Sequence, residues 1–106
     1  MKELAYMYGN TAFEWDAEKA SANVEKHGVS FEEAASTWDD DMAVTRGDTR
    51  HSWDEDRFLR LGISAAANML LVVHCYRDAL GAIRIISARK ATKKEETLYA
   101  ELRRLA

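Results

Sequence analysis

The chain has 106 residues, which is enough for one compact domain and too few for two domains that each bury their own core. Of these residues 47% are hydrophobic, 31% are charged and none is proline, a composition that excludes a disordered or collagen-like chain. The net charge is only −3, but residues 1–56 carry five Lys and Arg against fourteen Asp and Glu, whereas residues 57–106 carry ten against four.

The first predicted elements are a short strand and a helix. Phe13 and Trp15 alternate with polar neighbours, which predicts a strand over residues 11–16. Asp16 is a suitable N-cap for the helix that follows, and Gly28 supplies the left-handed residue that commonly ends one.

A second helix is predicted to begin directly afterwards. Ser30 and Glu33 have the spacing of a capping box, and Trp38 belongs to the face that this helix would bury. The acidic run 39–41 then predicts a solvated loop rather than a metal site, because no further carboxylate lies at a recognisable ligand spacing.

The second half of the chain has the pattern of strands followed by one helix. Strands are predicted over residues 42–45, 58–63, 70–76 and 83–86. The connections between them are too short for crossovers, so mostly antiparallel pairing is expected.

Thr92 and Glu95 form another capping box, which opens a C-terminal helix with an apolar stripe of Leu98, Leu102 and Leu105 that can dock on the sheet. We therefore expect an α+β fold, in which two N-terminal helices and a C-terminal helix pack on a mostly antiparallel sheet of four to five strands.

Basic residues gather near the predicted last strand. The segment 84–94 contains no acidic residue and five basic ones, Arg84, Arg89, Lys90, Lys93 and Lys94. The two lysines of the helix start oppose the helix dipole, and a bound phosphate would remove this conflict. The alternatives are a solvated basic rim and pairing with the acidic half of the chain.

Further arginines lie on or beside the predicted strands: Arg57, Arg60 and Arg77. Together with Arg84 they could form an electropositive sheet surface that binds a polyanion, or they could make ordinary cross-strand salt bridges.

Among the three histidines, His51 lies in a polar segment and is the best placed for acid–base chemistry. His27 and His74 have the settings of structural residues. No zinc, P-loop or serine-hydrolase motif is present, so we expect no metal and no cofactor. The single cysteine, Cys75, and the lack of a signal sequence or membrane span lead us to expect a cytoplasmic protein.

Several blocks of the chain resemble one family, the BrnT toxins, which are the ribonuclease components of type II toxin–antitoxin modules. The blocks are FEWDAEKASANVEKHGVSFEEA (13–34), RHS (50–52), RFLRLG (57–62), LLVVHCYR (70–77) and IRIISARKATKKE (83–95). The resemblance covers residues 13–104, so we expect one BrnT-like domain over residues 1–106 with an N-terminal extension, 1–12, outside the resemblance.

This resemblance implies a RelE-like fold and metal-independent RNA cleavage that inhibits translation. It also implies neutralisation by a BrnA-type antitoxin in a complex of two toxins and two antitoxins, with operator DNA contacted only through the antitoxin. We assign catalysis to Arg84, Arg89, Lys90 and His51. We assign RNA and phosphate binding to Arg57, Arg60, Arg77, Lys93 and Lys94. The alternative is a non-catalytic basic module that binds RNA or an acidic peptide.

Overall fold

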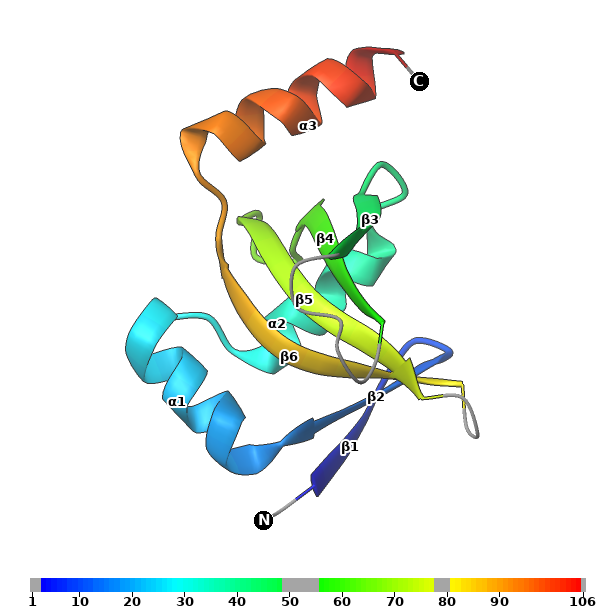
Figure 1. The fold of residues 1–106 in the computed structure, drawn as a ribbon, viewed down its shortest axis with the longest axis vertical. Coiled ribbons are helices and arrows are strands. Elements are labelled where there is room, and N and C mark those ends of the chain that lie inside the picture. Colours follow the sequence, from blue (N-terminus) through cyan, green and yellow to red (C-terminus); the bar gives the residue numbers. More distant parts are fainter. Residues whose placement is uncertain (1–2, 49–55, 78–80, 106) are drawn as a thin grey trace.

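The computed structural model describes residues 3–48, 56–77 and 81–105, and within these ranges it contains six strands and three α-helices. The chain runs through β1 (Glu3–Tyr8), β2 (Thr11–Asp16), α1 (Ala17–His27), α2 (Phe31–Ser36), a short 3-10 helix η1 (Thr37–Asp39), β3 (Val44–Asp48), β4 (Arg57–Ile63), β5 (Met69–Arg77), β6 (Ala82–Lys90) and α3 (Lys93–Leu105) (Figure 1).

The strands form one mixed sheet in the order β1-β2-β6-β5-β4-β3. Only β2 and β6 are parallel, and every other neighbouring pair is antiparallel. The expected antiparallel character is therefore confirmed, but the expected count of four to five strands is wrong. The additional strand is β1, which pairs with β2 across a tight turn where Gly9 has a φ of 59°.

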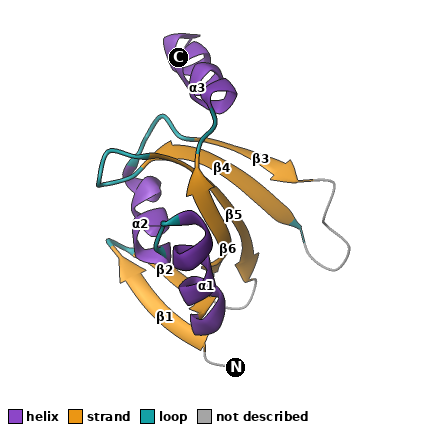
Figure 2. Ribbon diagram, turned by 90° about the vertical axis from the view of Figure 1, so that its left-hand side faces the viewer, coloured by secondary structure: helices purple, strands orange, loops and turns teal. Residues whose placement is uncertain are grey.

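Helices α1 and α2 cover one face of the sheet, and most of the core lies between them and the strands (Figure 2). The buried side chains of this layer include Phe13, Trp15, Phe31, Leu70 and Val72. The alternation of Phe13 and Trp15 that predicts β2 arises because both aromatic rings point into this layer. The opposite face of the sheet is left without these helices, and we call it the open face.

The predicted helix caps are present. The Asp16 carboxylate accepts hydrogen bonds from the N–H groups of Glu18 and Lys19, at 2.8 and 3.3 Å. Gly28 has a φ of 70° and ends α1 in the left-handed conformation. The Ser30 hydroxyl accepts a hydrogen bond from Glu33 N, which stabilises the start of α2.

The capping box of α2 is only half formed. The Glu33 carboxylate does not return to the start of its helix and instead accepts hydrogen bonds from Ser64 Oγ at 2.6 Å and Asn68 Nδ2 at 2.8 Å. Glu33 thereby ties α2 to the turn between β4 and β5.

The acidic run after η1 differs from its prediction, because Asp40 is not a solvated loop residue. Its carboxylate accepts hydrogen bonds from Met42 N at 2.9 Å, Ile63 N at 2.8 Å and the Tyr99 hydroxyl at 2.8 Å. Burial alone would raise the pKa of Asp40, but these three donors and nearby Arg60 lower it overall. Asp40 therefore joins β4 and α3 to the end of η1.

Helix α3 also differs from its prediction. Leu98, Leu102 and Leu105 do not dock on the sheet, and their exposed fractions are 43%, 37% and 76%. The helix is held instead by Tyr99, which is 3% exposed and bonded to Asp40. Because neighbouring helical residues point about 100° apart, burial of Tyr99 turns the leucine stripe outward. Figure 1 shows α3 standing apart from the layer of α1 and α2.

Asn23 makes the main polar connection between α1 and the central strand β6. Its side-chain amide donates hydrogen bonds to Val29 O at 2.9 Å and Ala88 O at 2.8 Å, and its oxygen accepts one from Ala88 N at 3.2 Å. Asn23 is 7% exposed, so these backbone groups have little access to water. The residue after Ala88 is Arg89, so Asn23 fixes the backbone beside a candidate catalytic residue.

Candidate nucleic-acid interface

Four of the predicted site residues lie on the open face of the sheet, and three of these belong to the neighbouring strands β5 and β6. Leu70 and Val72 point into the helix-covered core, so Arg77 of the same strand lies on the opposite face by alternation. Arg84 is directly opposite Cys75 and Arg89 is directly opposite Leu71, and both pairs belong to that face. The structure therefore brings Arg77, Arg84 and Arg89 to one surface.

Arg60 lies on the other face of β4. Its guanidinium sits 4.5 Å from the ring centre of Trp38 and donates hydrogen bonds to the carbonyls of Thr37 and Asp40, at 3.1 and 3.4 Å. Burial lowers the pKa of Arg60, although nearby Tyr76 and Asp40 offset part of this effect. The structure thus separates Arg60 from the arginines of the open face, and its assignment to RNA binding stays a prediction.

Arg77 and Arg84 form a cluster with two carboxylates at the β1 and β2 end of the open face. Arg84 makes a bidentate ion pair with Glu3, with N–O distances of 2.7 and 3.0 Å, and its NH1 lies 4.0 Å from Glu14 Oε1. Arg77 Nε donates to Glu14 Oε1 at 2.7 Å. The hydrogen bond to Glu3 raises the pKa of Arg84 and lowers the pKa of Glu3.

A second cluster lies where β6 meets α3. Arg89 makes a bidentate ion pair with Glu95, at 2.9 and 2.8 Å, which lowers the pKa of that carboxyl. Glu95 and Thr92 also form the predicted reciprocal capping box, at 2.8 and 3.2 Å. The side chains of Lys90, Lys93 and Lys94 are exposed around this pair. The predicted juxtaposition of basic residues and a helix start is therefore confirmed.

The two clusters are too far apart to act on one phosphate. Arg84 and Arg89 are five residues apart on β6, which corresponds to roughly 15 Å along a strand. A nucleic acid that contacted both would have to run along β6 and place different phosphates against each. The predicted residues therefore line an extended surface along β6, from Arg84 to Arg89, rather than a single pocket. We call this surface the track.

Arg57 begins β4 opposite Asp48, and alternation along the strand places it on the open face with Leu59 and Leu61. His51, the remaining candidate, lies outside the described residues.

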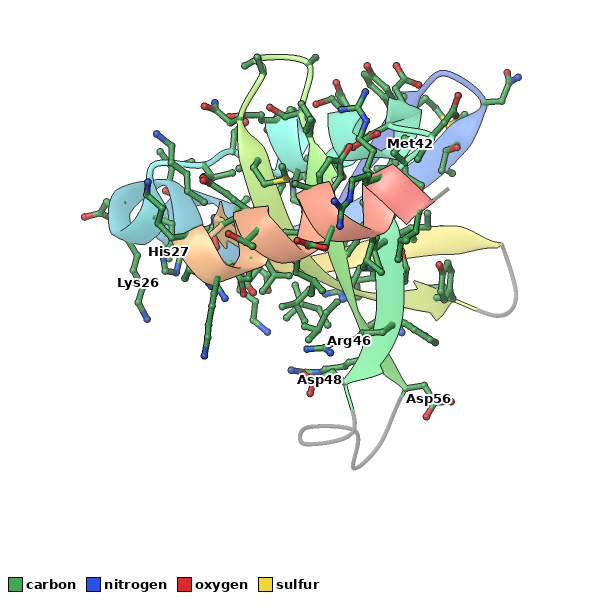
Figure 3. All side chains as sticks on the ribbon, turned by 90° about the horizontal axis from the view of Figure 1, so that it is seen from above. Lys26, His27, Met42, Arg46, Asp48 and Asp56 are labelled. Carbon is green, nitrogen blue, oxygen red and sulfur yellow. The ribbon has the colours of Figure 1, made fainter. Side chains whose placement is uncertain are left out.

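The acidic partners of these arginines and one further basic residue are not among the predicted site residues. Glu14 alternates with the buried Phe13 and Trp15, which is a signal for the open face, but its contact with Arg84 depends on the long-range pairing of β2 with β6. Glu3 belongs to a strand for which no pattern was recognised. Arg46, exposed on the edge strand β3, extends from the same side of that strand as Asp48 (Figure 3).

His74 is a structural residue, as expected, and it is fully buried. Its ring lies within 6 Å of the rings of Trp38, Phe58 and Tyr76, and neither nitrogen has a well-formed hydrogen bond among the described residues. Burial lowers its pKa to about 4, and a backbone group of Val72 offsets only part of that shift. His74 is therefore uncharged near neutral pH and is no candidate for proton transfer.

Because the His74 imidazole is buried and uncharged, we expect the free energy of unfolding to fall in mild acid. The unfolded chain binds a proton at His74 near pH 6.5, whereas the folded chain binds it only near pH 4. Stability is thus fully present above pH 6.5 and falls by up to about 1.4 kcal/mol per pH unit as the pH is lowered towards 4. Urea unfolding of wild type and His74→Leu at pH 7.0 and 5.0 measures this. An equal loss in both proteins would contradict the prediction.

The described part of the chain offers no group of three or more His, Cys, Asp or Glu side chains that could hold a metal ion. Within the same residue ranges, no helix is both long and apolar enough to cross a membrane.

Comparisons with known proteins agree with this architecture. The crystal structure of the Brucella abortus ribonuclease toxin BrnT has a similar fold, with a TM-score of 0.57 and 22% sequence identity over 74% of this chain and 94% of that chain. No match was found among curated protein sequences. The family model described as the ribonuclease toxin BrnT of type II toxin–antitoxin systems matches residues 15–95. The chain therefore belongs to the BrnT family of ribonuclease toxins.

Proposed function

We propose that this protein is a metal-independent endoribonuclease that cleaves RNA, inhibits translation and is neutralised by a BrnA-type antitoxin. The family assignment supports the reaction class. The observation that supports the site is the placement of Arg84 and Arg89 on the same face of β6, with exposed Lys90 at the end of that strand. Arginine and lysine side chains aligned along one strand suit a polyanion backbone.

The reaction that fits these groups is attack of a ribose 2′-hydroxyl on the adjacent phosphorus. The new P–O bond closes a 2′,3′-cyclic phosphate, and cleavage of the P–O5′ bond releases a 5′-hydroxyl end. Arg89 and Lys90 would stabilise the negative charge of the phosphorane, while Arg84, Arg77 and Arg57 bind flanking phosphates.

Proton transfer requires another group, because arginine stays protonated at cellular pH. His51 would remove the proton from the 2′-hydroxyl and return one to the leaving 5′-oxygen. Lys90 would serve as the base only as a neutral amine, and it would then no longer stabilise the phosphorane by its charge. Lys93 and Lys94 at the start of α3 would bind a phosphate next to the scissile one, where the free N–H groups of the helix also attract anions.

The direct test is inducible expression of the chain without an antitoxin, with growth and bulk RNA integrity followed over time. We expect growth arrest and shortened RNA. Purified protein should also cleave RNA in excess EDTA and leave 5′-hydroxyl ends. Unchanged growth together with intact RNA would contradict the proposal, and cleavage that EDTA abolishes would contradict metal independence.

One observation favours the alternative, a basic module that binds RNA without cleaving it. Arg77, Arg84 and Arg89 each have a carboxylate partner in the structure, which offsets the charge that a phosphorane would need, whereas Lys90, Lys93 and Lys94 are exposed and can bind phosphates. Intact RNA after incubation with saturating pure protein, together with RNA binding that weakens as salt is raised, would establish this function instead.

The ion pair of Arg84 with Glu3 predicts a gain of RNA affinity when the carboxylate is neutralised. Glu3→Gln removes a negative charge beside the track, so we expect RNA to bind about fivefold more tightly at low salt, with a steeper salt dependence. Fluorescence anisotropy with labelled RNA measures both quantities. Glu101→Gln is the matched control, because Glu101 pairs with Arg104 at the far end of α3. Equal affinities for both variants would contradict the prediction.

A further inference from the structure

An apolar groove lies on the open face, between the sheet and α3. It has a volume of about 290 Å³, and Leu98 of α3 forms one wall. Its floor consists of aliphatic side chains from three neighbouring strands, Val44, Leu59, Leu61, Leu71 and Val73. Only Leu61 of the floor is buried, and the other four side chains are partly exposed. Such a surface on a sheet is normally covered, yet α1 and α2 lie on the other face (Figure 2).

The border of the groove carries as many acidic as basic side chains. Arg46 and Asp48 line it from β3, where they extend from the same side of the strand (Figure 3). Arg89 and Glu95 line it where β6 meets α3, and they form a bidentate ion pair. The border therefore has no net charge, so it favours neither a strongly acidic nor a strongly basic partner. An identical border can approach it without net repulsion.

A second apolar surface continues from the groove along α3. Leu98, Leu102 and Leu105 occupy positions i, i+4 and i+7 of the helix and are all exposed. This ridge cannot fill the groove of its own chain, because the contact of Tyr99 with Asp40 holds α3 in its orientation. One chain thus carries both an unfilled groove and an unburied ridge, and both are aliphatic.

The chemistry of these two surfaces distinguishes between possible occupants. The described residues that line the groove include no aromatic ring, whereas unpaired nucleobases bind mainly by stacking on aromatic side chains. A two-fold axis pairs identical surfaces, so a groove and a ridge on one chain can each cover the other in a pair of copies. A second copy therefore supplies both the apolar ridge and the balanced charges that suit this groove.

We propose that this groove is a self-association site, in which the leucine ridge of a second copy lies against the floor formed by β3, β4 and β5. Because Arg89 lines the groove, a second copy seated there covers it and competes with RNA for the same surface. This consequence for RNA rests on the proposed ribonuclease function. It predicts that cleavage per mole of protein falls as the protein concentration rises through the dissociation constant of the dimer.

The test is sedimentation equilibrium of the RNA-free wild-type chain and of a Leu98→Asn, Leu102→Asn variant over a range of concentrations. Asparagine is close to leucine in size and adds no charge, so the border is unchanged. We expect wild type to form a dimer and the variant to raise its dissociation constant at least about a hundredfold, since each substitution removes one apolar contact in each copy. The control is Val24→Asn on α1, which is 48% exposed on the helix-covered side.

A second variant, Arg46→Glu, tests the charge balance separately. It leaves Arg89 at a border with three acidic side chains, so identical borders then repel each other. We expect the dissociation constant to rise about tenfold at low salt and to recover as salt is raised, because salt screens this repulsion. Arg46 is exposed on the edge strand β3, so the variant should keep its fold. An unchanged dissociation constant at low salt would contradict the proposed interface.

RNA cleavage and circular dichroism measured on the same proteins separate the outcomes. A wild-type dimer that the leucine variant weakens and the control keeps supports the proposal, and if the leucine variant proves unfolded, Arg46→Glu decides. The proposal is overturned if wild type is a monomer at every concentration, if the control weakens the dimer equally, or if a folded leucine variant still dimerises, for example through the edge strand β3. Cleavage per mole that does not depend on concentration would overturn the competition with RNA. If no protein cleaves RNA but the dimer depends on the leucines, the ribonuclease proposal falls and the self-association site stands.

Discussion

Replacing Arg89 and Lys90 together by alanine should abolish growth arrest on induction and lower RNA cleavage by at least about a hundredfold. Both residues lie at the end of β6 beside the start of α3, where the strand and the helix bring cations together. Loss of the Arg89 guanidinium on the open face and of the exposed Lys90 ammonium at the end of the strand removes positive charge near the phosphorane, and this charge is worth more in the transition state than in the bound substrate. Cleavage of a fluorogenic RNA and growth after induction measure the effect.

The double variant should keep its fold. Without Arg89, Glu95 retains its two hydrogen bonds with Thr92, so the start of α3 stays capped. The matched control is Arg104→Ala, because Arg104 also pairs with a carboxylate of α3 but is 74% exposed in the last turn. Equal activity of the double variant and this control would place the catalytic site elsewhere, with the cluster around Arg84 as the next to be tested.

Asn23→Ala should destabilise the protein by about 3 kcal/mol, because it leaves three buried backbone groups without their partners. These groups are the carbonyls of Val29 and Ala88 and the N–H of Ala88. Each group would lose its hydrogen bond in a place where water has little access. The free energy of unfolding from urea titration measures the change.

Ser21→Ala is the control for Asn23→Ala, since Ser21 is exposed on the same helix and receives the same new residue. Because Asn23 holds the backbone next to Arg89, we also expect Asn23→Ala to lower RNA cleavage under conditions where the protein is still folded. A loss below about 1 kcal/mol would show that water replaces the amide at little cost.

The local features of the fold could be predicted from the sequence. The strand of Phe13 and Trp15, the caps at Asp16 and Gly28, and the capping box of Thr92 all depend on neighbouring residues only. The orientation of α3 could not be predicted, because its leucine stripe and Tyr99 compete for burial. The contact of Tyr99 with Asp40, 59 residues earlier, decides the outcome.

In the candidate site, too, local features could be predicted from the sequence and long-range contacts could not. The alternation of β6 indicates that Arg84 requires a partner or an open surface, and the structure supplies Glu3. That partner could not be identified beforehand, because it depends on β1 pairing with β2 and on β2 lying beside β6. Glu3 also lies before residues 15–95, which are the part of the chain that the family model matches, so the family resemblance does not identify it either.

The parallel contact between β2 and β6 has a consequence for synthesis of the protein. It pairs Phe13 with Ile83, whereas the β1–β2 hairpin and the succession from β3 to β6 are built from chain neighbours. A nascent chain that has not yet produced β6 therefore holds two sets of strands with no strand to join them, and closing that long loop is the slow step. The sheet, and with it the surface that carries Arg84 and Arg89, is therefore complete only after β6 has been translated.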